Sequence, residues 1–262
     1  MADLPQIDTT VAHSARVWNY WLGGKDHYPV DREVGDFVLQ AYPAMVAAAR
    51  ADREFLVRAV TYLAGEAGID QFLDVGTGLP THNNTHEVAQ AVAPGARVVY
   101  VDNDPMVLAH ARALLTGPDV HDVRYVDADL HSPEGVLAAA GEYLDLDRPV
   151  GLTVLGTMGH TADHAQACAT VRAYVDALPS GSHLALCDGS NTSEPMVEAA
   201  RRWNETAALP YHLRSPEEIE AFFTGLDLVE PGVVSASLWR PTAAEVGTPA
   251  HVDQYCGVAR KP

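Results

Sequence analysis

The pattern of apolar and polar positions predicts short buried strands that alternate with amphipathic helices. Apolar, β-branched runs occupy residues 71–75, 97–101, 123–126, 150–155 and 183–187, and polar residues follow each run. Helical periodicity resumes after the capping residues Asn84, Asp104 and Ser132. This repetition of strand, turn and helix is typical of βα units stacked on a parallel sheet.

Two helix starts are marked clearly, and two late runs indicate further strands. Asp104 and Pro105 form an N-cap and first-turn pair, and the apolar residues after them keep the helical period: Val107, Leu108, Ala111, Leu114 and Leu115. Residues 215–218 form a capping box that opens a helix through Phe222 and Phe223, which Gly225 ends. Runs at 233–239 and 254–259 predict two strands that close the edge of the sheet.

The first 69 residues stand outside this alternation. They predict a helical cap with a short helix at 15–22, which Gly23 and Gly24 end, and a longer helix at 50–64. We therefore expect one domain over residues 1–262, in which a cap or lid (1–69) covers a Rossmann-like core (70–262). The fold class is α/β, with a mostly parallel seven-stranded sheet and a C-terminal antiparallel edge.

Composition narrows the choice of partners and of cellular location. The 262 residues include 17 basic and 35 acidic side chains, a net charge of −18, which disfavours nucleic acid and anionic membrane surfaces as partners. Apolar runs long enough to span a membrane are absent from the sequence. Cys168, Cys187 and Cys256 are widely spaced and odd in number, so the sequence predicts neither a disulfide framework nor a C-x-x-C pair. We expect a cytoplasmic protein, and a homodimer is not excluded.

Acidic residues at three strand ends carry the candidate chemistry. Ligands of open α/β sheets bind beyond the carboxyl ends of the strands. Asp74 precedes a turn containing Gly76, Thr77 and Gly78 and is placed to face a cation, whereas Asp102 is placed to accept the two hydroxyls of a ribose. Asp129, which precedes Leu130, is placed to accept from an adenine amino group. A nucleoside with a cationic or zwitterionic tail fits this set, and S-adenosylmethionine is such a molecule.

A dinucleotide is the competing ligand, because Asp102 would serve the ribose of NAD equally well. The dinucleotide fingerprint G-x-G-x-x-G requires a third glycine, and Thr81 stands at that position. An acidic residue two places before the first glycine also suits a cation better than a pyrophosphate. The sequence therefore favours S-adenosylmethionine over a nicotinamide cofactor.

The run Asp74-Val75-Gly76-Thr77-Gly78 resembles the first signature of class I S-adenosylmethionine-dependent methyltransferases. The resemblance extends to residues 15–17, 22–26, 71–81, 99–105, 128–130 and 231–234, which are similar to an actinobacterial family of S-adenosyl methyltransferases. It implies S-adenosylmethionine as methyl donor, S-adenosylhomocysteine as product, and Asn103 and Leu130 as further cofactor-binding residues. It also implies that residues 22–26 form a lid over the cofactor.

His160 is the first candidate for a general base, because it follows the fourth strand where an acceptor would meet the methyl group. Tyr20, in the aromatic segment of the cap, is the second candidate, and Asp26 and Asp188 are weaker ones. We expect no metal, since no carboxylate follows the fourth strand. The expected acceptor is a small or medium metabolite, with an aromatic or heterocyclic natural-product intermediate as one candidate. A non-catalytic S-adenosylmethionine-binding protein remains open, as does, with less support, an NAD(P)-dependent oxidoreductase.

Overall fold

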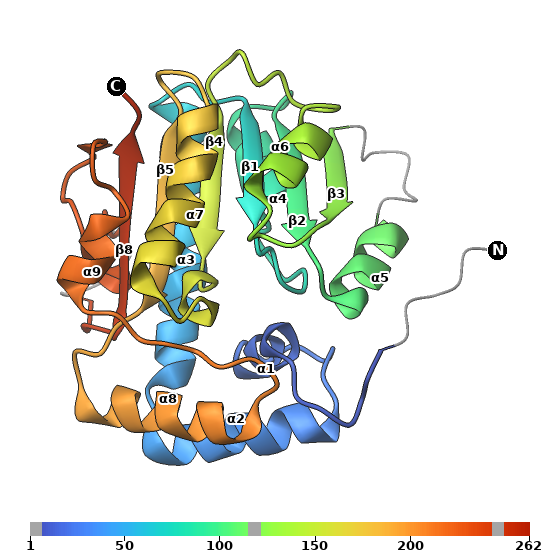
Figure 1. Ribbon diagram of the computed structural model, residues 1–262, viewed down its shortest axis with the longest axis vertical. Helices are drawn as coiled ribbons and strands as arrows, with labels where there is room; N and C mark the ends of the chain where they lie inside the picture. The colour runs from blue at the N-terminus through green and yellow to red at the C-terminus, as the bar shows by residue number, and fades with distance from the viewer. Residues whose placement is uncertain (1–6, 115–121, 243–248) are drawn as a thin grey trace.

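The protein folds into an eight-stranded sheet with helices on both faces, and five neighbouring strands of this sheet are parallel (Figure 1). A computed structural model describes residues 7–114, 122–242 and 249–262. The parallel strands are β1 (Gln71–Val75), β2 (Arg97–Asp102), β3 (Val123–Asp127), β4 (Gly151–Leu155) and β5 (His183–Gly189). β8 (Gln254–Arg260) pairs antiparallel with β5 and with two short strands, β6 (Asp227–Leu228) and β7 (Val234–Ser235). The order is β3-β2-β1-β4-β5-β8-β6, and β7 pairs with β8 off this path. The predicted mostly parallel sheet with a C-terminal antiparallel edge is confirmed.

The strand order reverses between β1 and β4, which pair in parallel along Phe72–Val75 and Gly151–Val154. β1 continues to β2 and β3 on one side, whereas β4 continues to β5 on the other. Loops on either side of such a reversal diverge and leave a crevice at the carboxyl ends of the strands. The topology therefore places the ligand site of this sheet beyond β1 and β4.

The C-terminal edge differs from the prediction in two ways. β6 (Asp227–Leu228) was not predicted, and it raises the number of strands from seven to eight. The strand predicted at 233–239 is wrong beyond β7 (Val234–Ser235), because residues Ala236–Leu238 form the 3₁₀ helix η2. Arg58 accounts for this, since its guanidinium donates to the carbonyls of Ala236 (2.6 Å) and Trp239 (2.7 Å) and so takes them out of sheet pairing.

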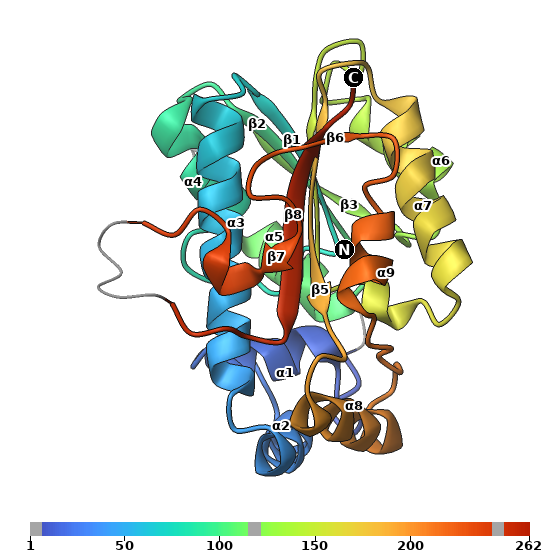
Figure 2. The ribbon, with the colours of Figure 1, turned by 90° about the vertical axis from the view of Figure 1, so that its left-hand side faces the viewer.

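Helices cover the sheet in two layers (Figure 2). α3 (Met45–Gly65) and α4 (Thr85–Val92) pack on one face. α6 (Pro133–Ala140), α7 (His164–Ala177) and α9 (Pro216–Ala221) pack on the other face, and α5 (Pro105–Leu114) lies beside β3. The capping box at Ser215 and the cap at Asp104 form as predicted. Leu115 lies outside the described residues.

The remaining helices lie beyond the carboxyl ends of the strands (Figure 1). They are α1 (Ser14–Trp21), α2 (Pro29–Ala41) and α8 (Glu194–Thr206), and α2 packs along α8. α1 matches the helix predicted at 15–22, and the helix predicted at 50–64 is the C-terminal part of α3. The sequence analysis makes no prediction for α2, α7 or α8, although Asp163 and Ser193 cap the last two. None of the helices in the described ranges is both long and apolar enough to cross a lipid bilayer.

Candidate active site

A cavity of about 290 Å³ lies between α1 and the carboxyl ends of the parallel strands. Its lining includes the eight residues that the sequence predicts for cofactor binding: Asp74, Gly76, Thr77, Gly78, Asp102, Asn103, Asp129 and Leu130. His160 lines the same cavity, as do Trp18 and Leu22 from the N-terminal segment. The fold thus brings four strand ends and the cap together around one space.

The turn after β1 depends on two glycines for different reasons. Gly76 has φ +76°, and a Cβ atom there would overlap the side chain of Thr157, which follows β4. Gly78 has φ +67° and open space where its Cβ would lie. The amides of Gly76 and Thr77 both donate to the carbonyl of Val101, at 2.8 and 3.2 Å. Gly76 is therefore required by the packing of the loop against Thr157 and by its backbone conformation.

Asp102 is fixed at the end of β2 by backbone amides. Its Oδ2 accepts from the amide of Gly78 (2.8 Å) and its Oδ1 from the amide of Asp104 (2.9 Å). Burial raises the pKa of Asp102, and these two hydrogen bonds oppose the rise. Each carboxylate oxygen has two lone pairs, so one per oxygen is left for a ligand at the cavity. The carboxylate is thus oriented to accept two hydroxyl groups side by side.

Asp129, after β3, is the most exposed of the acidic residues around the cavity. Its Oδ1 accepts from the amide and from Nδ1 of His131, both at 2.9 Å. The first of these bonds is the main reason that the pKa of Asp129 is lowered. The imidazole of His131 in turn contacts the hydroxyl of Thr161 at 2.8 Å. Asp129 is therefore an ionised acceptor at the rim of the cavity.

Asp74 lies deeper and is already hydrogen-bonded. The hydroxyl of Thr85 donates to its Oδ2 at 2.5 Å, and burial raises its pKa. This bond ties α4 to the end of β1. Asp74 therefore has a structural role, along with its place in the lining of the cavity.

The sequence analysis missed two neighbouring residues of α3, Asp52 and Arg53, which both line the cavity. Asp52 is 6% exposed, and its Oδ1 has no hydrogen-bond partner in the described part of the chain. Burial raises the pKa of Asp52 to about 6. The sequence contains a signal for this residue. Asp52 occupies the same helical face as Phe55 and Leu56, and a carboxylate on a buried apolar face is unfavourable unless it has a partner.

Arg53 has a similar shortage of partners. The Nη2 of its guanidinium donates to the carbonyls of His82 (3.3 Å) and Asn83 (3.0 Å), whereas its Nε is buried without a partner in the described ranges. Asp52 thus leaves one acceptor atom unpaired and Arg53 one donor atom, and both residues line the same cavity. A group that carries both an ammonium and a carboxylate would satisfy both residues.

His160 ends η1 (Met158–His160), the turn after β4. Its Nδ1 lies 2.9 Å from the carbonyl of Pro210. A carbonyl oxygen only accepts, so Nδ1 carries the proton and Nε2 of the neutral ring carries the lone pair. Burial is the main reason that the pKa of His160 is lowered, which favours this neutral form. The ring is thus held in the tautomer that a general base needs.

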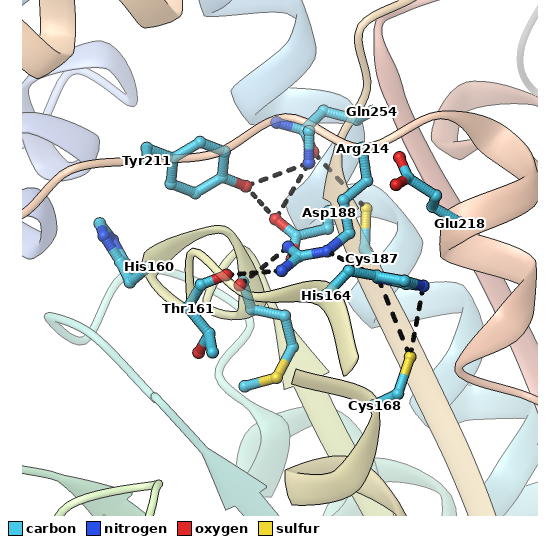
Figure 3. Close-up of polar contacts among 12 residues, drawn as sticks. His160, Thr161, His164, Cys168, Cys187, Asp188, Tyr211, Arg214, Glu218 and Gln254 are labelled. Atoms are coloured by element: carbon cyan, nitrogen blue, oxygen red, sulfur yellow. Dashed lines mark hydrogen bonds and ion pairs between the residues drawn. The ribbon is translucent and has the colours of Figure 1, made fainter. Parts of the chain in front are cut away.

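A buried polar cluster fixes the turn that carries His160 (Figure 3). Arg214 donates to the carbonyls of Met158 (2.8 Å) and Thr161 (2.6 Å), on either side of His160. The amide of His212 donates to the carbonyl of Gly159 at 2.7 Å. Both contacts come from the segment between α8 and α9, which therefore positions the imidazole.

The structure does not bring the other base candidates to the cavity. The hydroxyl of Tyr20 donates to Asp36 at 2.6 Å, away from the lining residues. Asp26 is partly exposed, 3.7 Å from His110. Asp188 is buried at the end of β5, where it accepts from Tyr211 and from the amide of Gly189, and burial raises its pKa to about 6. Of the four candidates, His160 alone is among the described lining residues.

A second, smaller pocket of about 40 Å³ adjoins the cavity. It lies among α1, α2 and α8, and its walls are mostly apolar: Trp21, Val38, Met45, Met196 and Trp203 contribute. Ser14, Trp18 and His160 line both spaces. His160 therefore stands at the junction of a polar cavity and an apolar pocket.

Two solved structures are similar to this chain over almost its whole length. A protein of the DUF574 family from Streptomyces avermitilis is 45% identical over 98% of this chain and all of its own, with a TM-score of 0.92. A proposed methyltransferase from Thermobifida fusca is 40% identical over 97% of this chain and 96% of its own, with a TM-score of 0.90. No curated protein sequence matches the chain.

More distant structures share the fold. NodS, an N-methyltransferase from Bradyrhizobium japonicum solved with S-adenosylhomocysteine, is 15% identical, covers 82% of this chain and 88% of its own, and has a TM-score of 0.51. NodS and this chain therefore share a fold. A family model described as S-adenosyl methyltransferase matches residues 2–262. The chain thus belongs to the S-adenosyl methyltransferase family, whose cofactor is S-adenosylmethionine.

Proposed function

We propose that the protein transfers a methyl group from S-adenosylmethionine to a small or medium-sized metabolite and releases S-adenosylhomocysteine. One observation carries the proposal: the acidic and glycine residues at the ends of β1, β2 and β3 line one cavity together with His160. The family supports the cofactor. An aromatic or heterocyclic acceptor remains one candidate, because three indole rings lie around the pocket beside His160.

The residues of the cavity fit each part of this cofactor. Asp102 would accept the two ribose hydroxyls through its two free lone pairs. Asp129 would accept from the adenine amino group. Asp52 and Arg53, each with an unpaired buried atom, would bind the ammonium and the carboxylate of the methionine tail. When bound, S-adenosylmethionine supplies a methyl group that its sulfonium activates.

His160 would take the acceptor's proton through Nε2, since Nδ1 is engaged by Pro210. Trp18 and Leu22, on the cap side of the cavity, would exclude water from the reacting groups. Positioning of the acceptor dominates such a displacement and can contribute about 7–11 kcal/mol. The cap and the 209–214 segment therefore matter as much as the base itself.

Two other functions use the same cavity. A non-catalytic S-adenosylmethionine-binding protein would need the cofactor residues alone, and the single tautomer in which His160 is held argues for catalysis. An NAD(P)-dependent oxidoreductase would need to place a pyrophosphate against the turn after β1. The amides of Gly76 and Thr77 are already bonded to Val101, which argues against that ligand.

Calorimetric titration of the purified protein tests the proposal. We expect micromolar binding of S-adenosylmethionine and S-adenosylhomocysteine and no binding of NADH or NADPH. Binding of a nicotinamide cofactor in place of the first pair would overturn the proposal. Once the cofactor binds, mass spectrometry of acceptor mixtures incubated with S-adenosylmethionine separates an enzyme, which yields a product 14 Da heavier than its acceptor (about one CH₂ group), from a binding protein.

A further inference from the structure

The pocket of about 40 Å³ beside His160 is not used by the cofactor residues described above. α1, α2 and α8 surround it, and it meets the cofactor cavity where Ser14, Trp18 and His160 line both spaces. A molecule that reaches from this pocket to the cofactor must pass His160. The position is therefore that of an acceptor subsite.

The walls of the pocket offer apolar surface and aromatic rings. Trp21 lies between Trp18 and Trp203, with ring centroids 5.8 and 6.2 Å away. Tyr211 contributes its ring, because its hydroxyl donates to Asp188 and accepts from the amide of Gly189 at 3.0 Å. A charged group placed here would lose its hydration without a partner of opposite charge among the described lining residues.

The surroundings of the pocket also disfavour an anion. The carboxylate of Asp188 lies behind Tyr211, and its Oδ2 has no hydrogen-bond partner within the described residues. The nearest charge that offsets it is Arg214, whose Nη1 is 3.9 Å from that oxygen. A protonated amine is unsuited for another reason, since it has no lone pair with which to attack a methyl group. Both arguments favour an uncharged acceptor.

We propose that this pocket is the acceptor subsite and takes a short apolar substituent of an uncharged, hydroxylated acceptor, whose hydroxyl lies at His160. This inference rests on the proposed function. A cavity that holds benzene measures about 150 Å³, so a 40 Å³ pocket holds a few carbon atoms and not a ring. A ring, where the acceptor has one, lies at the junction beside Trp18 and His160.

The chemical step balances without any further reactant. The acceptor oxygen forms a bond to the methyl carbon, and the bond from that carbon to sulfur breaks, with its electron pair going to sulfur. The proton of the acceptor hydroxyl moves to Nε2 of His160. The products are a methyl ether, S-adenosylhomocysteine and a protonated imidazole, which returns the proton to water.

Fluorine NMR can test the subsite without a known substrate. The probes are 4-(trifluoromethyl)benzyl alcohol, 4-(trifluoromethyl)benzoate and 4-(trifluoromethyl)benzylamine, which share one short apolar group and differ in charge. Saturating S-adenosylhomocysteine keeps them out of the cofactor cavity. We expect line broadening and a ring-current shift for the alcohol, with binding at least about ten-fold weaker for both ions. Equal binding of an ion, or no effect on the alcohol, would overturn the inference.

A matched pair of variants on α8 locates the binding. Ala200 lines the pocket and is half-buried, whereas Val197 on the same helix is 47% exposed. Ala200→Phe should weaken binding of the alcohol at least about ten-fold, while Val197→Phe should leave it within about two-fold. Leu213→Ala should enlarge the pocket and tighten binding, which keeps the test valid if Ala200→Phe does not fold.

The outcomes separate this inference from the proposed function. If the wild-type protein does not bind S-adenosylhomocysteine, the proposed function fails, and titration of the probes without it still measures the pocket. If S-adenosylhomocysteine binds but the variants of Ala200 and Val197 behave alike, the cofactor assignment stands and the acceptor subsite is wrong.

Discussion

The cofactor side and the acceptor side of this site are built in different ways. The cofactor side consists of residues next to strand ends, so each of Asp74, Asp102 and Asp129 stands directly beside the element that positions it. The proposed acceptor side is assembled from Trp18 on α1, Trp203 on α8 and Tyr211 in the segment that follows, and more than half of the chain separates Trp18 from the other two. Spacing along the sequence predicts the first side, and on the second side it predicts His160 but not the apolar pocket beside it.

The difference has a physical basis in parallel sheets. Hydrogen-bonded strands in fixed register bring their carboxyl ends to one edge, so residues at those ends converge whatever the connecting helices do. Helices of the cap have no such register. Their positions depend on side-chain packing, as where α2 of the cap packs along α8 of the core.

Removal of the candidate base should give the largest effect, and this effect should be confined to the acceptor side of the site. His160→Ala should lower the rate of S-adenosylhomocysteine release with an accepted acceptor by about 10²–10⁴-fold, because the proton loses its acceptor. Calorimetry should show cofactor affinity within about two-fold of wild type. A variant that turns over at the wild-type rate would remove His160 from the reaction.

Asp102→Ala is the corresponding change on the cofactor side. Hydrogen bonds to a charged group contribute about 1.5–3 kcal/mol each, so the loss of two should weaken S-adenosylhomocysteine at least about 100-fold in calorimetry. Asp127→Ala is the matched control, since Asp127 is exposed at the end of β3 and is not among the described lining residues. Similar losses in both variants would show that charge near the strand ends, and not Asp102 itself, controls binding.

The sequence predicted the strand ends, the glycine turn and His160, all of which the structure brings to one cavity. It did not predict α2 or α8, although both carry local helix-start signals: Asp31 completes a capping box with Tyr28 in α2, and Ser193 caps α8. The run at 233–239 predicts a strand by its composition, and Arg58, 178 residues earlier, overrides that preference by binding its carbonyls. Tyr20 belongs to an aromatic segment in which Trp18 faces the cavity and Tyr20 turns to Asp36. Local sequence patterns thus predict features that local geometry determines, and they do not predict those that depend on contacts between distant segments.

Asp52 and Arg53 are an exception to this division. They line the cofactor cavity, yet they lie on α3 and not at the end of a strand. Asp52→Asn should weaken S-adenosylhomocysteine about ten-fold by removing a charge-assisted bond to its ammonium. 5′-Methylthioadenosine lacks the amino-acid tail, so its affinity should stay unchanged. Glu54→Gln, at an exposed neighbouring position, is the control. Parallel losses for both ligands would place the effect in the fold and not in recognition of the tail.

The same carboxylate predicts how binding depends on pH. Burial raises the pKa of Asp52 to about 6, with Asp74 and Asp188 adding to the rise and Arg53 opposing it. Below that pH Asp52 is neutral and loses its attraction for the ammonium, so S-adenosylhomocysteine should bind more weakly at pH 5 than at pH 7. The pKa of Asp102 is also raised, but in the proposed binding mode Asp102 contacts the ribose of both ligands. The affinity for S-adenosylhomocysteine divided by that for 5′-methylthioadenosine therefore isolates the contribution of the tail. This ratio should decrease as the pH is lowered from 7 to 5 in the wild type and stay constant in Asp52→Asn. An equal decrease in both proteins would assign the pH dependence to another group.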